Sequence, residues 1–211
     1  MYYLVLDTSS PRGLFSILKN DHILLKQEVA FGVRESNELV PIIETGLNQL
    51  ELSLDEINTI ILSKGPGSFT GLRIGASVAK ALSYAKSIPI LTVDSLKCFD
   101  PIEEGSFAVL LDAKAKGIYL QKALKENGAI HYEDKSPTLT LEKLEEKILN
   151  IEKLVTSNKN SFKNKLNNET FARLVEMTPN PLQMLKLALK KAKTCALNAH
   201  DSLDLEYFNT P

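Results

Sequence analysis

The sequence predicts an α/β protein built from two mixed sheets in tandem. Short apolar runs bounded by turn residues alternate with longer stretches in which apolar residues recur every three or four positions. Residues 1–100 give the order strand, strand, strand, helix, strand, helix, strand, which is typical of a mixed sheet covered by helices. The stretch 100–105, with its Pro and Gly, then separates a second series of strands. We therefore expect an N-terminal half-domain at residues 1–100 and a C-terminal half-domain at residues 101–211.

The first half-domain is expected to open with a three-stranded meander. Its strands are expected at residues 2–6, 14–18, 22–30, 59–62 and 90–93. Its helices are expected at residues 36–50 and 72–87. Pro41 is compatible with the first helix only close to its start, because a proline in the interior of a helix breaks or kinks it.

The second half-domain is expected to be shorter and more divergent. Its strands are expected at residues 107–111, 118–124, 129–132 and 154–155. Its helices are expected at residues 141–149, 169–176 and 182–193. The Asn- and Lys-rich stretch 158–168 is expected to be a mobile loop.

The composition is that of an ordinary soluble globular protein, with 44% hydrophobic and 24% charged residues. The 25 Lys and Arg residues face 26 Asp and Glu residues, so autonomous binding to nucleic acid is not expected. Cys98 and Cys195 lie far apart without metal-site spacing, which disfavours a disulfide and favours a cytoplasmic location. The first apolar run ends at Asp7 and has no basic leader, so neither a signal peptide nor a membrane anchor is expected.

The most informative motif is Gly65-Pro-Gly-Ser-Phe-Thr-Gly-Leu-Arg-Ile-Gly75, which is expected to join a strand to a helix. It lacks the Gly-Lys-Ser/Thr of a Walker A loop, the spacing of a Rossmann fingerprint and the glycines of a nucleophile elbow. Ser68 or Thr70 is expected to cap the helix, whose N-terminus would attract an anion. The residues alone favour a structural turn over a phosphate contact, and leave both interpretations open.

This motif resembles the signature of the TsaB family (formerly YeaZ), and other segments agree in order. They are Leu4-Val-Leu-Asp-Thr-Ser9, Ile88-Pro-Ile-Leu-Thr-Val-Asp-Ser-Leu96, Leu111-Asp-Ala113 followed by Gly117-Ile-Tyr119, and a faint echo at Leu205-Glu-Tyr207. The resemblance is strong over residues 1–120 and weak beyond them.

The resemblance implies an actin-like ATPase fold (ASKHA, ribonuclease H-like). It also implies a non-catalytic subunit that pairs with TsaD, the catalytic relative that transfers a threonylcarbamoyl group to an adenosine beside the tRNA anticodon. The P-loop ATPase TsaE would join the assembly, and tRNA would be met only through the complex. This chain would require no cofactor itself, with ATP or ADP and Mg²⁺ possible at the complex interface.

The distribution of histidines supports a non-catalytic, metal-free role. Metal-bearing relatives use two histidines four residues apart on one helix face. Here His22, His131 and His200 are scattered. The segment Arg34-Glu-Ser-Asn-Glu38 stands where many family members have His-Ser. We therefore assign no catalytic residue and no metal ligand, and a peptidase is not expected.

A vestigial nucleotide cleft is expected where the fold repeats its first strand. Its candidate residues are Asp7, Ser9, Gly67, Ser68 and Asp112. Two carboxylates facing one cleft would suit Mg-ATP or acid–base chemistry, so the alternative function is a small-molecule kinase or ATPase that uses Asp7 and Asp112. The same carboxylates suit turn-capping remnants of a duplicated fold, which we favour because Asp is common in turns.

The partner surface is expected on the two long helices of the first half-domain. Its candidate residues are Leu39, Ile42, Ile43, Gly46, Leu47, Leu50, Ile74, Val78, Ala81 and Leu82. One apolar stripe per helix equally suits packing on the chain's own sheet. Gly46 and the small second side of the later helix favour contact with TsaD, or with a second copy when TsaD is absent. The cluster Lys186–Lys193 is expected to be a solvated helix face rather than a tRNA contact.

Overall fold

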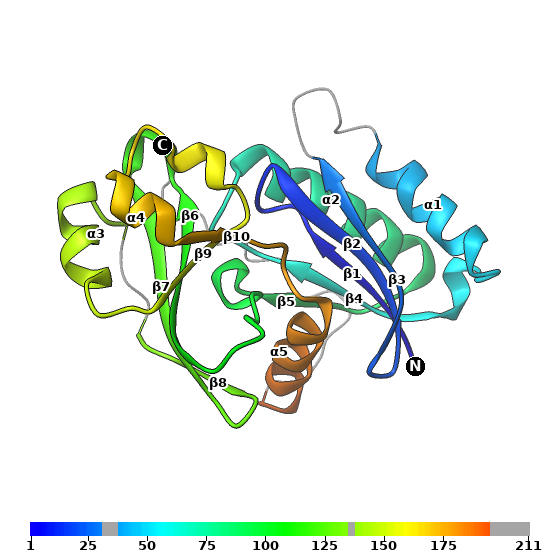
Figure 1. The fold of residues 1–211 in the computed structure, drawn as a ribbon. Helices are drawn as coiled ribbons and strands as arrows, with labels where there is room; N and C mark the ends of the chain where they lie inside the picture. Colours follow the sequence, from blue (N-terminus) through cyan, green and yellow to red (C-terminus); the bar gives the residue numbers. More distant parts are fainter. Residues whose placement is uncertain (31–37, 135–137, 195–211) are drawn as a thin grey trace.

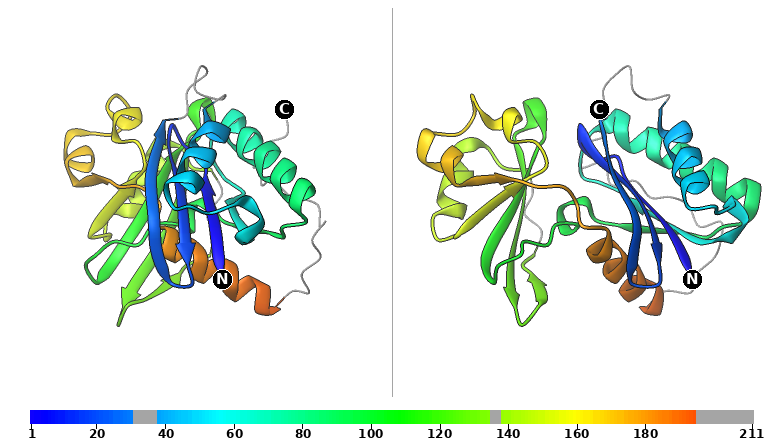
Figure 2. Two further views of the ribbon diagram at one scale, coloured as in Figure 1. Left: turned by 90° about the vertical axis from the view of Figure 1, so that its right-hand side faces the viewer. Right: turned by 45° about the vertical axis from the view of Figure 1, so that its right-hand side comes forward.

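The computed structural model describes residues 1–30, 38–134 and 138–194. These residues form two five-stranded sheets that lie side by side, each covered by helices (Figures 1 and 2). Within the described residues, no helix is long and apolar enough to cross a bilayer.

The first sheet is built from residues of the first hundred positions. Its strands are β1 (Tyr2–Asp7), β2 (Arg12–Lys19), β3 (His22–Ala30), β4 (Ile57–Ser63) and β5 (Ile90–Val93). They are ordered β3-β2-β1-β4-β5. The central strand β1 is antiparallel to β2 and parallel to β4, so the sheet is mixed as predicted.

The second sheet repeats this arrangement. Its strands are β6 (Gly105–Asp112), β7 (Ile118–Glu126), β8 (Ala129–Tyr132), β9 (Lys153–Thr156) and β10 (Leu174–Glu176), in the order β8-β7-β6-β9-β10. Strand β6 is antiparallel to β7 and parallel to β9. The repeat of one strand order in two sheets is the ribonuclease H-like, actin-like arrangement, and it confirms the predicted fold class.

Helices cover both sheets. They are α1 (Leu39–Gln49), α2 (Phe69–Lys86), α3 (Leu141–Ile148), α4 (Asn168–Arg173) and α5 (Pro181–Thr194). Short 3-10 turns are η2 (Leu54–Glu56), η3 (Ser95–Lys97), η4 (Lys114–Lys116) and η5 (Lys159–Phe162). Helix α1 begins at Leu39, so Pro41 lies in its first turn, as expected for a proline in a helix. Helix α2 begins at Phe69, three residues earlier than predicted, because Ser68 caps it by accepting a hydrogen bond from Gly71 N at 3.3 Å.

Side chains of each strand alternate between the two faces of the first sheet. Both faces are covered by helices, so both sets of side chains are buried. Leu4 and Leu6 of β1 belong to the core beneath α1 and α2. Tyr3 and Val5 belong to a second core on the other face, where α5 supplies Met184. This explains why β1 reads as a continuous apolar run rather than an alternating one.

Helix α5 therefore packs on the sheet of the half-domain to which it does not belong by sequence. Its buried residues Met184, Leu185 and Ala188 contact strands β1, β4 and β5. In the opposite direction, Leu96 and Phe99 around η3 pack on the second sheet. The boundary at residue 100 thus separates the two sheets, but not all the elements that cover them.

Two predicted elements of the second half-domain were wrong. The stretch 158–168 is not an irregular loop: it contains η5, and Phe162 and Leu166 are buried in the core of the second sheet. The helix expected over 169–176 ends at Arg173, and the next three residues form β10. Leu174 is buried there and pairs in parallel with Leu154, so sheet pairing overrides the local helical pattern.

Candidate functional site

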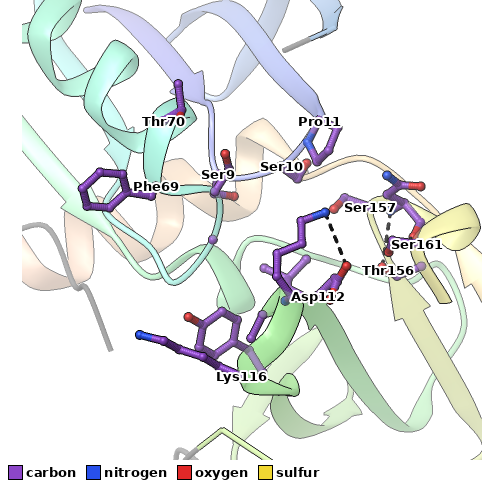
Figure 3. A pocket seen from close by; sticks show the side chains of 17 residues that line it. Ser9, Ser10, Pro11, Phe69, Thr70, Asp112, Lys116, Thr156, Ser157 and Ser161 are labelled. Carbon is purple, nitrogen blue, oxygen red and sulfur yellow. Dashed lines mark hydrogen bonds and ion pairs between the residues drawn. The ribbon is translucent and has the colours of Figure 1, made fainter. Parts of the chain in front are cut away.

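A cleft of about 530 Å³ opens between the two half-domains. Figure 3 shows Ser9, Ser10 and Pro11 of the β1–β2 turn on one side, facing Asp112 and Thr156 at the ends of β6 and β9. The N-terminal end of α2, the turn η4 and the residues around η5 complete its lining. Four of the five predicted cofactor-binding residues, Ser9, Gly67, Ser68 and Asp112, line the cleft, whereas Asp7 does not.

The two candidate carboxylates occupy equivalent positions in the repeated fold. Asp7 ends β1 and Asp112 ends β6. Each accepts a hydrogen bond from the backbone N–H two residues further on, Ser9 N at 3.2 Å and Lys114 N at 2.8 Å. Such bonds are typical of Asp in turns, so the geometry agrees with the turn-capping interpretation.

Asp7 is enclosed by protein rather than exposed to the cleft. Its side chain is 1% exposed, and burial raises its pKa, an effect that the nearby hydroxyls of Ser63 and Ser9 only partly offset. Among the described residues, neither Asp7 Oδ2 nor the hydroxyls of Thr8 and Ser63 have a hydrogen-bond partner. Burial therefore disfavours the charged form of Asp7, and its hydrogen bond to Ser9 N stabilises the β1–β2 turn.

Replacing Asp7 with Asn is expected to leave the fold at least as stable at neutral pH. The variant keeps the Oδ1 acceptor for Ser9 N and removes the buried ionisation. Because the native pKa is raised, wild-type stability falls as pH rises from about 3.8 through that raised pKa, and Asp7→Asn removes this slope. In urea denaturation, the free energy of unfolding of the variant relative to that of wild type should increase as the pH is raised from acidic to neutral. Asp21→Asn, at an exposed position, is the control. If Asp7→Asn became less stable relative to wild type as the pH rises, the raised pKa of Asp7 would be contradicted.

Asp112 faces the cleft, but lysines already neutralise it. Its Oδ1 accepts a short hydrogen bond from Lys165 Nζ, and its Oδ2 lies 3.5 Å from Lys114 Nζ. A cation therefore stands beside this carboxylate, and that cation comes from the chain itself. Asp7 and Asp112 do not form a pair of open carboxylates facing one cavity.

The glycines of the 65–75 motif fit against the chain's own β1–β2 turn. A Cβ on Gly67 would lie 2.2 Å from Ser9 O, and one on Gly71 would lie 2.1 Å from Thr8 O. Ser68 N donates a hydrogen bond to Ser9 O at 2.6 Å, which occupies one of the N–H groups that a phosphate contact would need. The structural-turn interpretation thus accounts for these glycines.

The predicted partner residues divide into two groups. Leu39, Ile43, Gly46 and Leu47 are buried within the chain's own core. A Cβ on Gly46 would lie 2.5 Å from Phe15 Cε1, so this glycine serves packing of α1 on its own sheet rather than approach of a partner. The other residues are at least partly accessible: Ile42, Leu50, Ile74, Val78, Ala81 and Leu82.

The small side of α2, which was expected to favour contact with a partner, instead packs on the chain's own sheet: Ala76, Ala79 and Ser83 are buried there. The candidate partner residues on the other stripe of α2 are half-buried (Ile74, Val78, Leu82) or exposed (Ala81). Helices α1 and α2 lie side by side on the outside of the first sheet (Figures 1 and 2). Val40 of α1 and Tyr84 of α2 add exposed apolar surface, at 52% and 86% exposure.

The described histidines are isolated. His22 is an exposed residue whose Nδ1 lies 2.7 Å from Asp21 Oδ1, and His131 lies on β8. His200 and residues 34–37 of the segment Arg34–Glu38 fall outside the described residues. Among the described residues, no three His, Cys, Asp or Glu side chains are placed so that they could hold one metal ion.

Most of the cleft residues that come from the second half-domain were not predicted from the sequence. Lys165 lies in the stretch expected to be a loop, and nothing in the sequence connects it to Asp112. The lysines of Ala113-Lys-Ala-Lys116 directly follow Asp112, and this was a usable signal for a basic turn at the cleft. The lysine cluster of α5 lies away from this lining, and its Lys191 Nζ donates to Thr92 Oγ1 at 2.9 Å.

Comparison with known proteins identifies the family. The model of the tRNA N6-adenosine threonylcarbamoyltransferase family, TsaD, matches residues 34–197. The chain is 32% identical to the tRNA threonylcarbamoyladenosine biosynthesis protein TsaB of Buchnera aphidicola (from Acyrthosiphon pisum) over 144 residues, 65% of each chain. The chain belongs to the TsaD family, and its sequence is similar to TsaB proteins.

Other TsaB proteins agree at similar distance. TsaB of Bacillus subtilis is 28% identical over 133 residues, 62% of this chain and 58% of that protein. The chain thus spans less than two thirds of these relatives' length. A solved structure titled YeaZ from Pseudomonas aeruginosa covers 98% of this chain and 99% of its own, at 18% identity and a TM-score of 0.75. At that identity the structural match establishes the fold, which extends over both half-domains.

Proposed function

We propose that this chain is a non-catalytic subunit of the machinery that makes threonylcarbamoyladenosine in tRNA, and that it supports the catalytic subunit TsaD. The observation that carries the proposal is its match to TsaB proteins, which are named for biosynthesis of this nucleoside. The model of the TsaD family matches most of the chain, which fits a pair of related subunits.

The geometry of the cleft supports a non-catalytic role. Magnesium–nucleotide chemistry in a two-lobed fold needs carboxylates open to a metal ion. Asp7 is buried beneath its turn, and Asp112 is held by Lys165 and Lys114. Neither this geometry nor the comparisons support the kinase alternative.

Pairing with TsaD would use the outer face of α1 and α2. Ile74, Val78 and Leu82 are half-buried there, and Ala81 and Tyr84 are exposed beside them. A contiguous apolar face on paired helices is the kind of surface that associates with another helical face. TsaE would join the complex formed in this way, tRNA would be bound only through the complex, and any ATP or ADP with Mg²⁺ would lie at the subunit interface. A homodimer through the same face is the expected state when TsaD is absent.

The test is reconstitution with the cognate TsaD. The purified chain alone is expected to transfer no threonylcarbamoyl group to tRNA. Mixed with TsaD it should co-elute in size-exclusion chromatography, and with TsaE and ATP it should stimulate transfer from the adenylate donor. Separate elution together with unchanged transfer would refute the proposal.

A further inference from the structure

Asn127 and Gly128 form the two-residue turn between β7 and β8. Glu126 and Ala129, on either side of the turn, face each other in the ladder, and the turn residues have positive φ values of 52° and 73°. Positive φ at both positions is what a type I′ hairpin turn requires, and an Asn-Gly pair favours it. Asn127 is the only asparagine of the chain that is followed by a glycine. Neither the cleft nor the outer face of α1 and α2 includes this turn.

An asparagine that precedes a glycine is chemically reactive in water. The backbone nitrogen of the glycine loses its proton and attacks the side-chain amide carbon, which closes a succinimide ring. The bond from that carbon to the amide nitrogen breaks, and ammonia leaves with the proton. Water then opens the ring at either carbonyl and gives aspartate or isoaspartate. Glycine favours the first step because it has no Cβ beside the attacking nitrogen.

The turn leaves the reacting groups accessible. Asn127 and Gly128 are both exposed, and a Cβ placed on Gly128 would meet no atom of the described residues within 4 Å. The nitrogen of Gly128 donates its hydrogen bond to a side chain, Glu104 Oε1 at 3.0 Å, and not to a carbonyl of the ladder. An exposed carboxylate therefore lies beside the proton that this nitrogen must lose.

The turn between β2 and β3 provides an internal comparison. Asn20 lies there between the paired residues Lys19 and His22, is exposed, and has a positive φ of 54°. It is followed by Asp21, which has a side chain beside the backbone nitrogen, and its own Oδ1 accepts a hydrogen bond from the N-terminal amine at 2.9 Å. The two asparagines thus share exposure and a positive φ, but only one has a glycine after it.

We propose that Asn127 is a site of spontaneous deamidation, and that the isoaspartate formed there loosens β8. In isoaspartate the main chain continues through the side-chain carboxyl carbon, so the turn gains a backbone atom. The register of a hairpin depends on the length and type of its turn. Strand β8 has four residues and lies at the edge of the second sheet, where it pairs with β7 (Figure 1). So short an edge strand has few other bonds to hold its register.

Strand β8 also carries a connection between the two half-domains. The hydroxyl of Tyr132 donates a hydrogen bond to Lys97 O at 2.8 Å and accepts one from Gln183 Nε2 at 2.7 Å. Lys97 lies in η3, between the two sheets in sequence, and Gln183 lies on α5, which packs on the first sheet. A shift of β8 therefore weakens contacts of both. This inference does not depend on the proposed function, because it involves no residue of the α1 and α2 face.

Peptide mapping of the full-length chain by mass spectrometry measures the reaction. During incubation at mildly alkaline pH, aspartate and isoaspartate should accumulate at Asn127 at least tenfold faster than at Asn20. Gly128→Ala should slow the reaction at Asn127 at least tenfold, because the added Cβ hinders the attacking nitrogen. Equal rates at the two asparagines of the wild type, or an unchanged rate in Gly128→Ala, would overturn the proposal.

A second variant avoids the strain that alanine meets at the positive φ of Gly128. Asp21→Gly places a glycine after Asn20 at an exposed position, and it should raise the rate at Asn20 while the rate at Asn127 stays unchanged. If Asn20 reacted no faster in this variant, the following glycine would not be what makes Asn127 reactive.

Hydrogen exchange tests whether the rearranged main chain loosens β8. In the isoaspartate form, purified by chromatography, amides of residues 129–132 should exchange at least tenfold faster than in the unmodified chain. Asn127→Asp is the matched control, because it adds the same charge to an unaltered main chain, and its exchange should stay close to wild type. Unchanged exchange in the isoaspartate form, or an equal increase in Asn127→Asp, would refute the effect on the strand register.

Discussion

The variant Ala81→Glu is expected to abolish the complex with TsaD while the isolated chain stays folded. Ala81 is exposed on α2. Near it on this helix, Val78 and Leu82 are half-buried and Tyr84 is highly exposed. Glutamate is a good helix former, so the change costs the free chain little. A partner seated on this face would bury the new carboxylate without a counter-charge, at a cost of several kcal/mol. We expect the dissociation constant to rise at least 100-fold, or roughly 2.7 kcal/mol.

Calorimetric titration of TsaD with each variant measures this change directly. Ala129→Glu is the matched control, because Ala129 is exposed on β8 of the other half-domain and the substitution is the same. It should bind TsaD like wild type. Thermal unfolding of free Ala81→Glu should resemble that of the unmodified chain, whereas free Ala129→Glu should be slightly less stable because its carboxylate lies opposite Glu126 across the strands. Wild-type affinity in Ala81→Glu would show that TsaD binds another surface.

Much of the architecture could be predicted because its signals are local. The buried strands β1, β4 and β6 are apolar runs bounded by turn residues, and each was found within a few positions of its observed bounds. The runs predicted two mixed sheets in tandem, whereas the order of the strands within each sheet was not predicted from them. Strand β10 was missed because its three residues carry no pattern of their own, and only pairing with β9 defines them.

The site was less predictable because it depends on contacts between distant residues. Asp112 was a candidate, but its pairing with Lys165 spans 53 positions and has no local signature. Gly46 was correctly recognised as a point of close approach, yet the neighbour is Phe15 of the chain's own sheet. In α2 the sequence showed two narrow stripes, and only the fold decides that the one with small residues faces the sheet.

Alanine at Gly71 or Gly75 is expected to destabilise the chain strongly, and a second substitution should rescue one of the two. A Cβ on Gly71 would lie 2.1 Å from Thr8 O, a backbone atom that cannot be removed. A Cβ on Gly75 would lie 2.3 Å from Thr8 Oγ1, a side-chain atom. Overpacking at such sites costs about 3 kcal/mol, because α2 must shift away from the β1–β2 turn.

Thr8→Ala removes the two nearest atoms that obstruct a Cβ at position 75, Thr8 Oγ1 and Cγ2, and leaves only the milder contact with Leu62 Cδ1 at 3.2 Å; it leaves the carbonyl that obstructs a Cβ at position 71. The double variant with Gly75→Ala should therefore regain about 2 kcal/mol in urea denaturation, whereas the double variant with Gly71→Ala should regain none. Ser77→Ala, exposed on the same helix, should stay within about 0.5 kcal/mol of wild type. If Thr8→Ala restored the stability of both glycine variants equally, the Thr8 carbonyl would not be what excludes a side chain at position 71. The selective result would show that these glycines exist to seat α2 on the β1–β2 turn, in the space where an open phosphate-binding turn would otherwise lie.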